Sequence, residues 1–165
     1  MNKELSWDEF FIGMCLHASK KSKDKSTKLG AVIVSPDNTV LSIGFNGFPR
    51  GLDDEIKEYH LRPMKYSITE HAERNAIYNA ARKGVRLEGS IMYLPFEPTP
   101  CTDCTRGVIQ AGIVEVRGTD FKFTGKGKQW DDNLAIAKEM LVHAGIKRTI
   151  VPVSSEYDIR NLYKS

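Results

Sequence analysis

The chain has 165 residues, of which 41% are hydrophobic and 27% are charged, and its formal net charge at pH 7 is +3. These values are typical of a globular domain with a hydrophobic core, and the small net charge gives no argument by itself for a nucleic-acid partner. No run of about 18 apolar residues is present, which argues against a membrane span, and the acidic first ten residues do not resemble a signal peptide. We therefore expect one domain over residues 1–165.

The first third of the chain predicts a helix followed by a hairpin. Apolar residues recur at helical spacing over 7–18, and Ser6 is a suitable N-terminal cap. Residues 30–34 and 40–45 are strand-like and flank a short turn, which predicts an antiparallel pair. Residues 46–68 are expected to form a long loop that could include a short helix. A loop this long in a compact domain is usually functional.

The remainder of the chain alternates between helical and strand-like patterns. The predicted elements are a helix over 71–83, a strand over 90–94, a helix over 102–111, a strand over 113–117, a helix over 131–144 and a strand over 148–153. Helical crossovers make the last three strands parallel, with right-handed connections. With the hairpin, they predict an α/β fold of three layers, α-β-α, in which helices cover both faces of a mixed five-stranded sheet. The final residues are expected to pack loosely.

A motif in two parts carries the chemistry, namely His71-Ala72-Glu73 and Pro100-Cys101-Thr102-Asp103-Cys104. One imidazole and two thiolates supply three Zn²⁺ ligands and leave the fourth tetrahedral position to water, as catalytic sites do. The ligands lie at the predicted N-termini of two helices, where the helix dipole favours thiolates. Glu73 is the expected proton carrier. The order H-x-E…P-C-x-x-C is the signature of zinc deaminases that act on nucleobases.

A structural zinc clip is the alternative interpretation of the cysteine pair, and it requires a fourth protein ligand. The candidates for this ligand are Cys15, His17, His60 and His143. Packed or surface roles are usual for three of them, whereas His60, in the long loop, stays open as a second metal ligand or a nucleotide contact. Three cysteines give no disulfide framework, and thiolate ligands suit a reducing cytosol.

Beyond the zinc motif, residues 5–152 resemble the deoxycytidylate (dCMP) deaminases, the branch of the cytidine deaminase superfamily that acts on free nucleotides. The matching stretches are 22–24, 30–34, 44–51, 71–77 and 100–113. The glycine-rich stretch 44–51 separates this branch from the tRNA and free-base deaminases. Residues 130–132 and 143–146 look most like the viral members, whose compartment would be the host cytosol.

The resemblance implies a cytidine-deaminase-like form of the three-layer fold. It also implies zinc-dependent conversion of dCMP and water to dUMP and ammonia, which supplies dUMP for dTTP synthesis, and dCTP could be a further substrate. The residues that it assigns to the substrate are Ala72, Asn46 for a sugar hydroxyl and a ring carbonyl, Phe121 for stacking on the sugar, and Ser22, Lys23 and Lys28 for the phosphate. Phe121 stands where relatives often have tyrosine.

Members of this family are typically hexamers that dCTP activates and dTTP inhibits, with Mg²⁺ accompanying the triphosphate. The candidate effector-binding residues are Asn46, Gly47, Phe48, Arg50, Gly51 and Arg82. Phe45 and Leu52 border this loop and replace the tyrosine and cysteine of many relatives. We therefore expect a homo-oligomer with nucleotide substrates and nucleotide effectors.

Two rival functions stand beside this hypothesis. A deaminase that acts on tRNA or single-stranded DNA would need aromatic stacking platforms and a long basic track. The track formed by Lys122, Lys126 and Lys128 is short, so a nucleic-acid partner is not expected. A non-enzymatic zinc-binding module would hold the metal without an exchangeable water.

Overall fold

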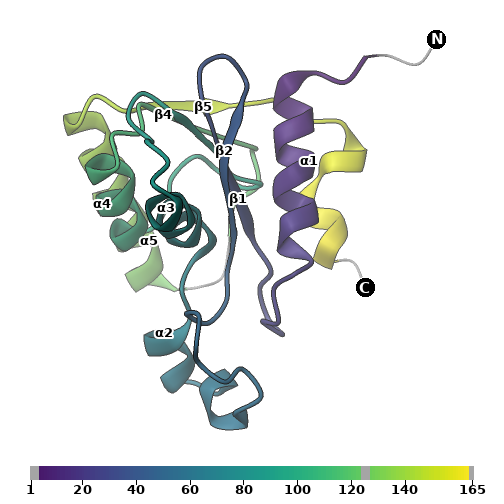
Figure 1. The fold of residues 1–165 in the computed structure, drawn as a ribbon, viewed down its shortest axis with the longest axis vertical. Coiled ribbons are helices and arrows are strands. Elements are labelled where there is room, and N and C mark those ends of the chain that lie inside the picture. The colour runs from purple at the N-terminus through teal and green to yellow at the C-terminus, as the bar shows by residue number, and fades with distance from the viewer. Residues whose placement is uncertain (1–3, 124–126, 164–165) are drawn as a thin grey trace.

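A computed structural model describes residues 4–123 and 127–163 of the chain (Figure 1). The helices are α1 Trp7–Ser19, α2 Met64–Ile68, α3 Ala72–Lys83, α4 Thr102–Gln110 and α5 Lys128–His143. The strands are β1 Gly30–Val34, β2 Val40–Phe45, β3 Ile91–Tyr93, β4 Glu115–Gly118 and β5 Lys147–Ile150. Short 3₁₀ helices are η1 Lys57–His60, η2 Ser155–Tyr157 and η3 Ile159–Tyr163. None of the helices in the described part of the chain has the length and hydropathy of a transmembrane segment.

The strands form one sheet in the order β2-β1-β3-β4-β5. β1 pairs antiparallel with β2 and with β3, whereas β3, β4 and β5 run parallel to one another. The mixed five-stranded sheet expected from the sequence is therefore confirmed. The long loop over 46–68 contains two short helices, η1 and α2, rather than one.

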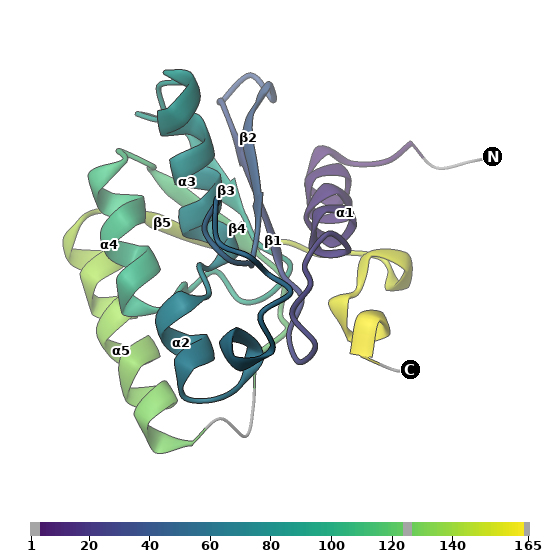
Figure 2. The same ribbon diagram turned by 60° about the horizontal axis from the view of Figure 1, so that its bottom comes forward.

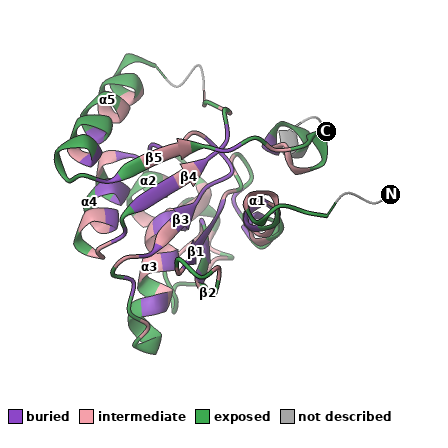
Figure 3. Ribbon diagram, turned by 90° about the horizontal axis from the view of Figure 1, so that it is seen from above, coloured by how far each residue is buried: buried purple, intermediate pink, exposed green. Residues whose placement is uncertain are grey.

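Helices cover both faces of the sheet, as the three-layer prediction requires (Figures 1 and 2). α1 lies on one face, and α3, α4 and α5 lie on the other. β1 is buried along its whole length and lies between α1 and α3 (Figure 3). Its side chains alternate between two cores, because Ala31 and Ile33 pack in the cluster under α3 whereas Val32 and Val34 pack in the cluster under α1. Burial on both faces accounts for the unbroken apolar run of this strand.

The edge strand β2 lies very close to α3. A Cβ atom at Gly44 would lie 2.3 Å from the backbone nitrogen of Ala76, so a larger residue does not fit between these elements. The side-chain amides of Asn75 and Asn79 donate hydrogen bonds to carbonyl oxygens of β2. These contacts hold α3, which begins directly after His71, against the sheet.

Tyr157 and Ile159 are packed in the described part of the C-terminal segment, so the expectation of loose packing is wrong there, whereas residues 164–165 lie outside the described residues. Val151 and Ile159 are buried in the cluster that contains Phe11 of α1, and Tyr157 packs against the same cluster. A Cβ atom at Gly13 would lie 3.0 Å from the ring of Tyr157. Apolar side chains spaced along this segment therefore give it a fixed place beside α1, because their burial removes apolar surface from water.

Candidate metal centre and adjoining cavities

Three possible metal ligands converge at the N-terminal ends of α3 and α4. His71 and Cys101 are the residues that precede these helices, and Cys104 lies in the first turn of α4. Nδ1 of His71 lies 3.5 Å from Sγ of Cys101 and 3.4 Å from Sγ of Cys104. The three ligand atoms all lie within 4.8 Å of one another, which is close enough for one ion to contact all of them.

The donor set fits Zn²⁺, which prefers imidazole nitrogen and thiolate sulfur. Within residues 4–123 and 127–163, no fourth histidine, cysteine or carboxylate joins the group. Cys15 instead donates its thiol hydrogen to the carbonyl oxygen of Tyr93, and Nε2 of His60 lies 2.7 Å from the carbonyl oxygen of Asp54. His17 and His143 are exposed on their helices. The arrangement is that of a three-ligand centre with an open position, as in catalytic rather than structural zinc sites.

The electrostatics of the group favour a thiolate. The hydrogen bond with Cys104 lowers the pKa of the Cys101 thiol to about 4, and the neighbouring Cys101 raises the pKa of His71 to about 9. The pKa of Cys104 is raised because its thiol is hydrogen-bonded to Cys101 and because it is buried. Nitrogen and sulfur donors that lie this close together are a suitable set for a divalent cation, which binds their deprotonated forms.

Glu73 lies beside this centre, in the first turn of α3. Its side chain is 3% exposed, and among the described residues its Oε2 atom has no hydrogen-bond partner. Burial raises the pKa of the Glu73 carboxyl group. A buried carboxyl oxygen without a partner is costly, so this atom is suited to a ligand or a water nucleophile.

A cavity of about 650 Å³ adjoins the metal centre. We call it the metal-centre cavity. The metal-centre cavity is lined by five of the residues that the sequence predicts for the site, namely His71, Cys101, Glu73, Asn46 and Ala72. The structure thus brings together the candidate ligands, the candidate proton carrier and part of the candidate substrate contacts.

The side chain of Asn46 is hydrogen-bonded to the backbone of residues 27–29. Its Oδ1 accepts a hydrogen bond from the backbone nitrogen of Leu29 at 2.7 Å, and its Nδ2 donates to the carbonyl oxygen of Thr27 at 2.8 Å. The side chain therefore fixes the backbone that forms one wall of the metal-centre cavity, a role that the sequence did not indicate.

The residues assigned to the substrate phosphate lie elsewhere. Lys23 forms ion pairs with Asp54 at 2.8 Å and Glu55 at 3.2 Å, and it lines a second cavity. The hydroxyl oxygen of Ser22 accepts a hydrogen bond from the backbone nitrogen of Asp24. Ser22 and the exposed Lys28 line neither of these two cavities. This placement gives no support to the expected phosphate contacts.

Phe121 does not line the metal-centre cavity either. It packs against both hydrophobic clusters and meets Phe123 edge to face, with ring centroids 5.1 Å apart. Phe123 and Phe96 are the phenylalanines that line the cavity. The placement of Phe121 thus gives no support to the expected contact with the sugar, and Phe123, two residues further along the chain, is the phenylalanine of this segment that lines the cavity.

The second cavity has a volume of about 500 Å³, and the effector-loop residues Gly47, Phe48 and Arg50 line it. We call it the basic cavity, because its lining also includes Lys21, Lys23, Lys25, His60, Arg62 and Lys65. Gly51 and Arg82 do not line it, and Asn46 lines the metal-centre cavity instead. The sequence leaves His60 open as a second metal ligand or a nucleotide contact. Its ring lies in the basic cavity, with its centroid 4.9 Å from that of Phe48, and it does not belong to the group of candidate zinc ligands.

Some residues of the metal-centre cavity have no signal in the sequence. Gln129, Trp130 and Asn133 reach it from the first turns of α5, and Arg62 and Lys65 reach it from the region of α2. Trp130 lies in a stretch that carries the family resemblance, but α2, which contains Lys65, is only five residues long and shows no periodic pattern. Of the short lysine track, Lys122 and Lys128 are exposed, and Lys126 lies outside the described residues.

The fold and the three-donor centre define a zinc-binding α/β protein. Residues 5–118 match the family described as the cytidine and deoxycytidylate deaminase zinc-binding region, and the chain belongs to this family. The matched region includes His71, Cys101 and Cys104. The family resemblance recognised in the sequence is therefore confirmed.

Two relatives and one solved structure show the extent of the similarity. A probable deoxycytidylate deaminase of Drosophila melanogaster is 35% identical over 132 residues, which cover 74% of this chain and 63% of the relative. The deoxycytidylate deaminase of Mus musculus is 36% identical over 117 residues, which cover 68% of this chain and 64% of the relative. The chain thus spans less than two thirds of the length of either relative.

The crystal structure of dCMP deaminase from the cyanophage S-TIM5, in complex with dCMP and dUMP, is similar in fold. Its TM-score is 0.68 at 23% identity, and the match covers 90% of this chain and 100% of that one. The cytidine-deaminase-like fold is therefore confirmed as well.

Proposed function

We propose that this chain is a zinc-dependent dCMP deaminase, which converts dCMP and water into dUMP and ammonia. The observation that carries the proposal is the buried, partnerless oxygen of Glu73, which lies beside a three-donor zinc centre in one cavity. The cavity volume of about 650 Å³ suits a small-molecule ligand. The similarity to deoxycytidylate deaminases of fly and mouse supports this substrate class.

In this proposal His71, Cys101 and Cys104 hold the zinc, which when bound supplies Lewis-acid activation of a water nucleophile. Glu73 takes one proton from the attacking water and delivers it to the ring nitrogen. It then takes the remaining proton of the hydroxyl group that has added to the ring carbon and delivers it to the amino group, which leaves as ammonia. Burial raises the pKa of Glu73 toward the range in which a carboxyl group both accepts and donates a proton.

Asn46 and Ala72 orient the nucleotide in this proposal. Asn46 fixes the backbone segment to which its side chain is hydrogen-bonded. Its Oδ1 accepts a hydrogen bond from Leu29 with one lone pair, and its second lone pair can accept a hydrogen bond from a sugar hydroxyl. Ala72 lies between the metal ligand and the proton carrier, so its backbone borders the reacting ring.

We also propose that dCTP activates and dTTP inhibits the enzyme through the basic cavity, with Mg²⁺ accompanying the triphosphate. The concentration of lysines and arginines there suits a polyphosphate. Gly47 of this cavity forms two backbone hydrogen bonds with Glu70, at 3.0 and 2.8 Å, and Glu70 directly precedes the ligand His71. Such a connection is a physical route for coupling, which requires different effector affinities in two states.

The remaining parts of the proposal concern the whole protein. We propose that residues 1–165 form a single deaminase domain, which the continuous five-stranded sheet supports. A homo-oligomer, by family a hexamer, and a cytosolic location, in the host if the source is viral, complete the hypothesis.

A substrate panel tests the proposal. Ammonia release is measured from dCMP, dCTP, deoxycytidine, cytidine, tRNA and single-stranded DNA, each with and without dCTP or dTTP as effector. We expect the highest kcat/KM for dCMP, a rise with dCTP and a fall with dTTP. Turnover of tRNA or DNA alone would establish the polynucleotide alternative. Zinc binding without turnover of any substrate would establish a non-enzymatic zinc module.

A further inference from the structure

The two cavities share two cationic residues, Arg62 and Lys65, and differ in the other cations that face them. Lys21, Lys23 and Lys25 line only the basic cavity, so they are not placed to meet a nucleotide at the zinc centre. Among the described residues, the lysine and arginine side chains that line the metal-centre cavity are Lys65 and Arg62, which lie within and just before α2.

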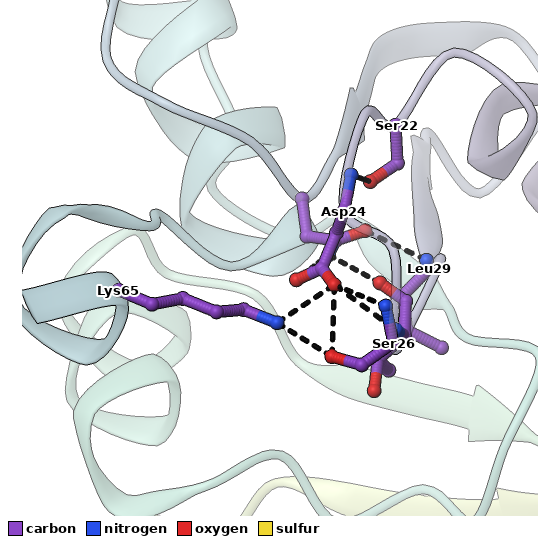
Figure 4. A network of polar contacts seen from close by, with 7 residues as sticks. Ser22, Asp24, Ser26, Leu29 and Lys65 are labelled. Atoms are coloured by element: carbon purple, nitrogen blue, oxygen red, sulfur yellow. Dashed lines mark hydrogen bonds and ion pairs between the residues drawn. The ribbon is translucent and has the colours of Figure 1, made fainter. Parts of the chain in front are cut away.

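The ammonium group of Lys65 is held firmly at the wall of the metal-centre cavity. Its side chain is 15% exposed and lies 2.7 Å from Oδ1 of Asp24 and 2.5 Å from Oγ of Ser26 (Figure 4). An ammonium group has three N–H donors, and these bonds use two of them among the described residues. The third donor is therefore available to a ligand, and partial burial reduces the screening of its charge by salt.

Asp24 serves to position this ammonium group. Its Oδ1 also accepts hydrogen bonds from the backbone nitrogens of Ser26 and Thr27, at 2.8 and 3.1 Å. Burial raises the pKa of Asp24, but the bonds from Lys65, Ser26 and Thr27 outweigh it, so the pKa is lowered overall. The carboxylate charge is thus satisfied within the protein, and an incoming anion meets a fixed cation rather than a free carboxylate.

The chemistry of the rest of the cavity directs a phosphate to this wall. The base must reach Glu73 and the metal centre to react, so the phosphate of the same nucleotide has to lie at another wall of the cavity. Arg62 stands near the same wall, with its guanidinium 5.5 Å from the ring centroid of Tyr66. It forms no ion pair among the described residues, so its charge is available as well.

We infer that Lys65 is the residue that selects for the 5′-phosphate of the substrate, with Arg62 as an outer cation and Asp24 as the positioning residue. This inference rests on the proposed deamination of a nucleotide and replaces Lys23 and Lys28 as the phosphate contacts. It makes Lys65 a determinant of specificity for a nucleotide over a nucleoside, rather than a participant in proton transfer.

The test compares ligands that differ only in the phosphate. The zinc-loaded wild type and Lys65→Met are assayed for kcat/KM with dCMP and deoxycytidine, and calorimetry gives Kd for dUMP and deoxyuridine. We expect Lys65→Met to lose about 10- to 100-fold in kcat/KM for dCMP and in affinity for dUMP, through KM rather than kcat. The nucleosides should change little, and Lys65→Arg should retain most of the preference. Lys138→Met, on the exposed face of α5, is the matched control.

A purely structural role of Lys65 predicts a different result. Loss of the lysine leaves the buried Asp24 carboxylate unpaired, which would weaken nucleotide and nucleoside binding equally, and that outcome would overturn the inference. The double variant Asp24→Asn with Lys65→Met removes both charges, so it should fold normally and still lack the phosphate preference.

Two further outcomes would overturn it. One is that Lys23→Met loses the preference for dCMP over deoxycytidine while Lys65→Met keeps it. The other is a Lys65→Met variant that changes only the response to dCTP, which would assign the lysine to the basic cavity. Failure of the proposed function is distinct from these outcomes. It would appear as a wild type that releases no ammonia from dCMP, while the dUMP and deoxyuridine affinities still test the phosphate contact.

Discussion

Glu73 is 3% exposed, and its Oε2 has no hydrogen-bond partner among the described residues. Leaving such an oxygen unsatisfied costs about 1–3 kcal/mol of folding free energy. Buried polar atoms without a hydrogen-bond partner are expected at functional sites, where stability is given up for function. The carboxyl group lies beside His71 and the cysteine pair, where an oxygen without a partner can bind the water or the substrate of the reaction.

Replacement of Glu73 by glutamine should keep the zinc and remove turnover. Glutamine preserves the shape of the side chain but cannot carry the proton, so we expect kcat for dCMP to fall by about 10²- to 10⁴-fold. Zinc content, measured by atomic absorption, should equal that of the wild type. Glu139→Gln on the exposed face of α5 is the control, and a near-normal rate in Glu73→Gln would refute the proton-carrier role.

Replacement of Cys104 by alanine should release the metal. Sγ of Cys104 is one of three ligand atoms, and a zinc site with two protein ligands binds weakly. We expect zinc content to fall from about one ion per chain to a small fraction of that value, with a lower stability. Cys15→Ala is the matched control, because this buried thiol bonds to Tyr93 and should leave the zinc in place. Full zinc retention in Cys104→Ala would point to a different ligand set.

At the scale of elements, the contact between β2 and α3 fixes the position of the His71-Ala72-Glu73 motif relative to the sheet. The absent side chain of Gly44 lets the strand approach the backbone of Ala72 and Ala76, and the hydroxyl of Ser42 donates to the carbonyl oxygen of Ala76 at 2.6 Å. Because α3 begins directly after His71, a displacement of this helix would move a metal ligand.

Gly44→Ala should therefore damage both stability and metal affinity. The added methyl group would meet backbone atoms that cannot rotate away, and overpacking of this kind costs about 1–3 kcal/mol or more. Urea unfolding should show a lower midpoint, and titration with a chelator should remove zinc more readily. Gly47→Ala is the control, because its Cβ would lie 3.8 Å from the nearest side-chain atom. Equal midpoints for the two variants would argue against the close approach.

At the scale of the whole molecule, one polar network joins the start of α1 to the three parallel strands. The hydroxyl of Tyr93 donates to Asp8 at 2.7 Å, and Arg117 pairs with Asp8 and with Glu115, both at 3.0 Å. Thr149 of β5 donates to Glu115 at 2.6 Å. These groups connect distant parts of the chain, so their ionisation should affect global stability.

Glu115 should make that stability dependent on pH. Burial raises the pKa of Glu115, but bonds from Arg117 and Thr149 outweigh this effect and hold the pKa below its ordinary value of 4.5. A depressed native pKa adds stability that is fully present above the unfolded pKa and is lost as the pH falls through the native pKa.

Glu115→Gln should accordingly cost about 1–3 kcal/mol of unfolding free energy at neutral pH, and less near pH 3 and below. Urea unfolding of wild type and variant at both pH values measures the difference. Glu88→Gln is the control, since its pair with Arg86 is exposed and should contribute little at either pH. A cost of Glu115→Gln that does not shrink on acidification would contradict the assignment.

Much of the architecture could be predicted because its signals are local. The continuous apolar run of β1, the helical spacing in α1 and the strand–helix alternation after residue 90 each follow from a single stretch of chain. The packing of the C-terminal segment could not be predicted in the same way. Ile159 is buried only because α1, more than a hundred residues earlier, presents Phe11 and its neighbours to it.

For the candidate site, the amino-acid sequence by itself indicated the candidate zinc donors and the proposed proton carrier, because their types and short spacings at two helix starts are a chemical signature. Tertiary structure alone decided which cations face the metal centre. Lys65, in the short helix α2, and Asp24, in a loop, are 41 residues apart in the chain, whereas Lys23, adjacent to Asp24, pairs with Asp54 in the other cavity. The direction of side chains in such short or irregular segments depends on long-range contacts, and no local pattern encodes them.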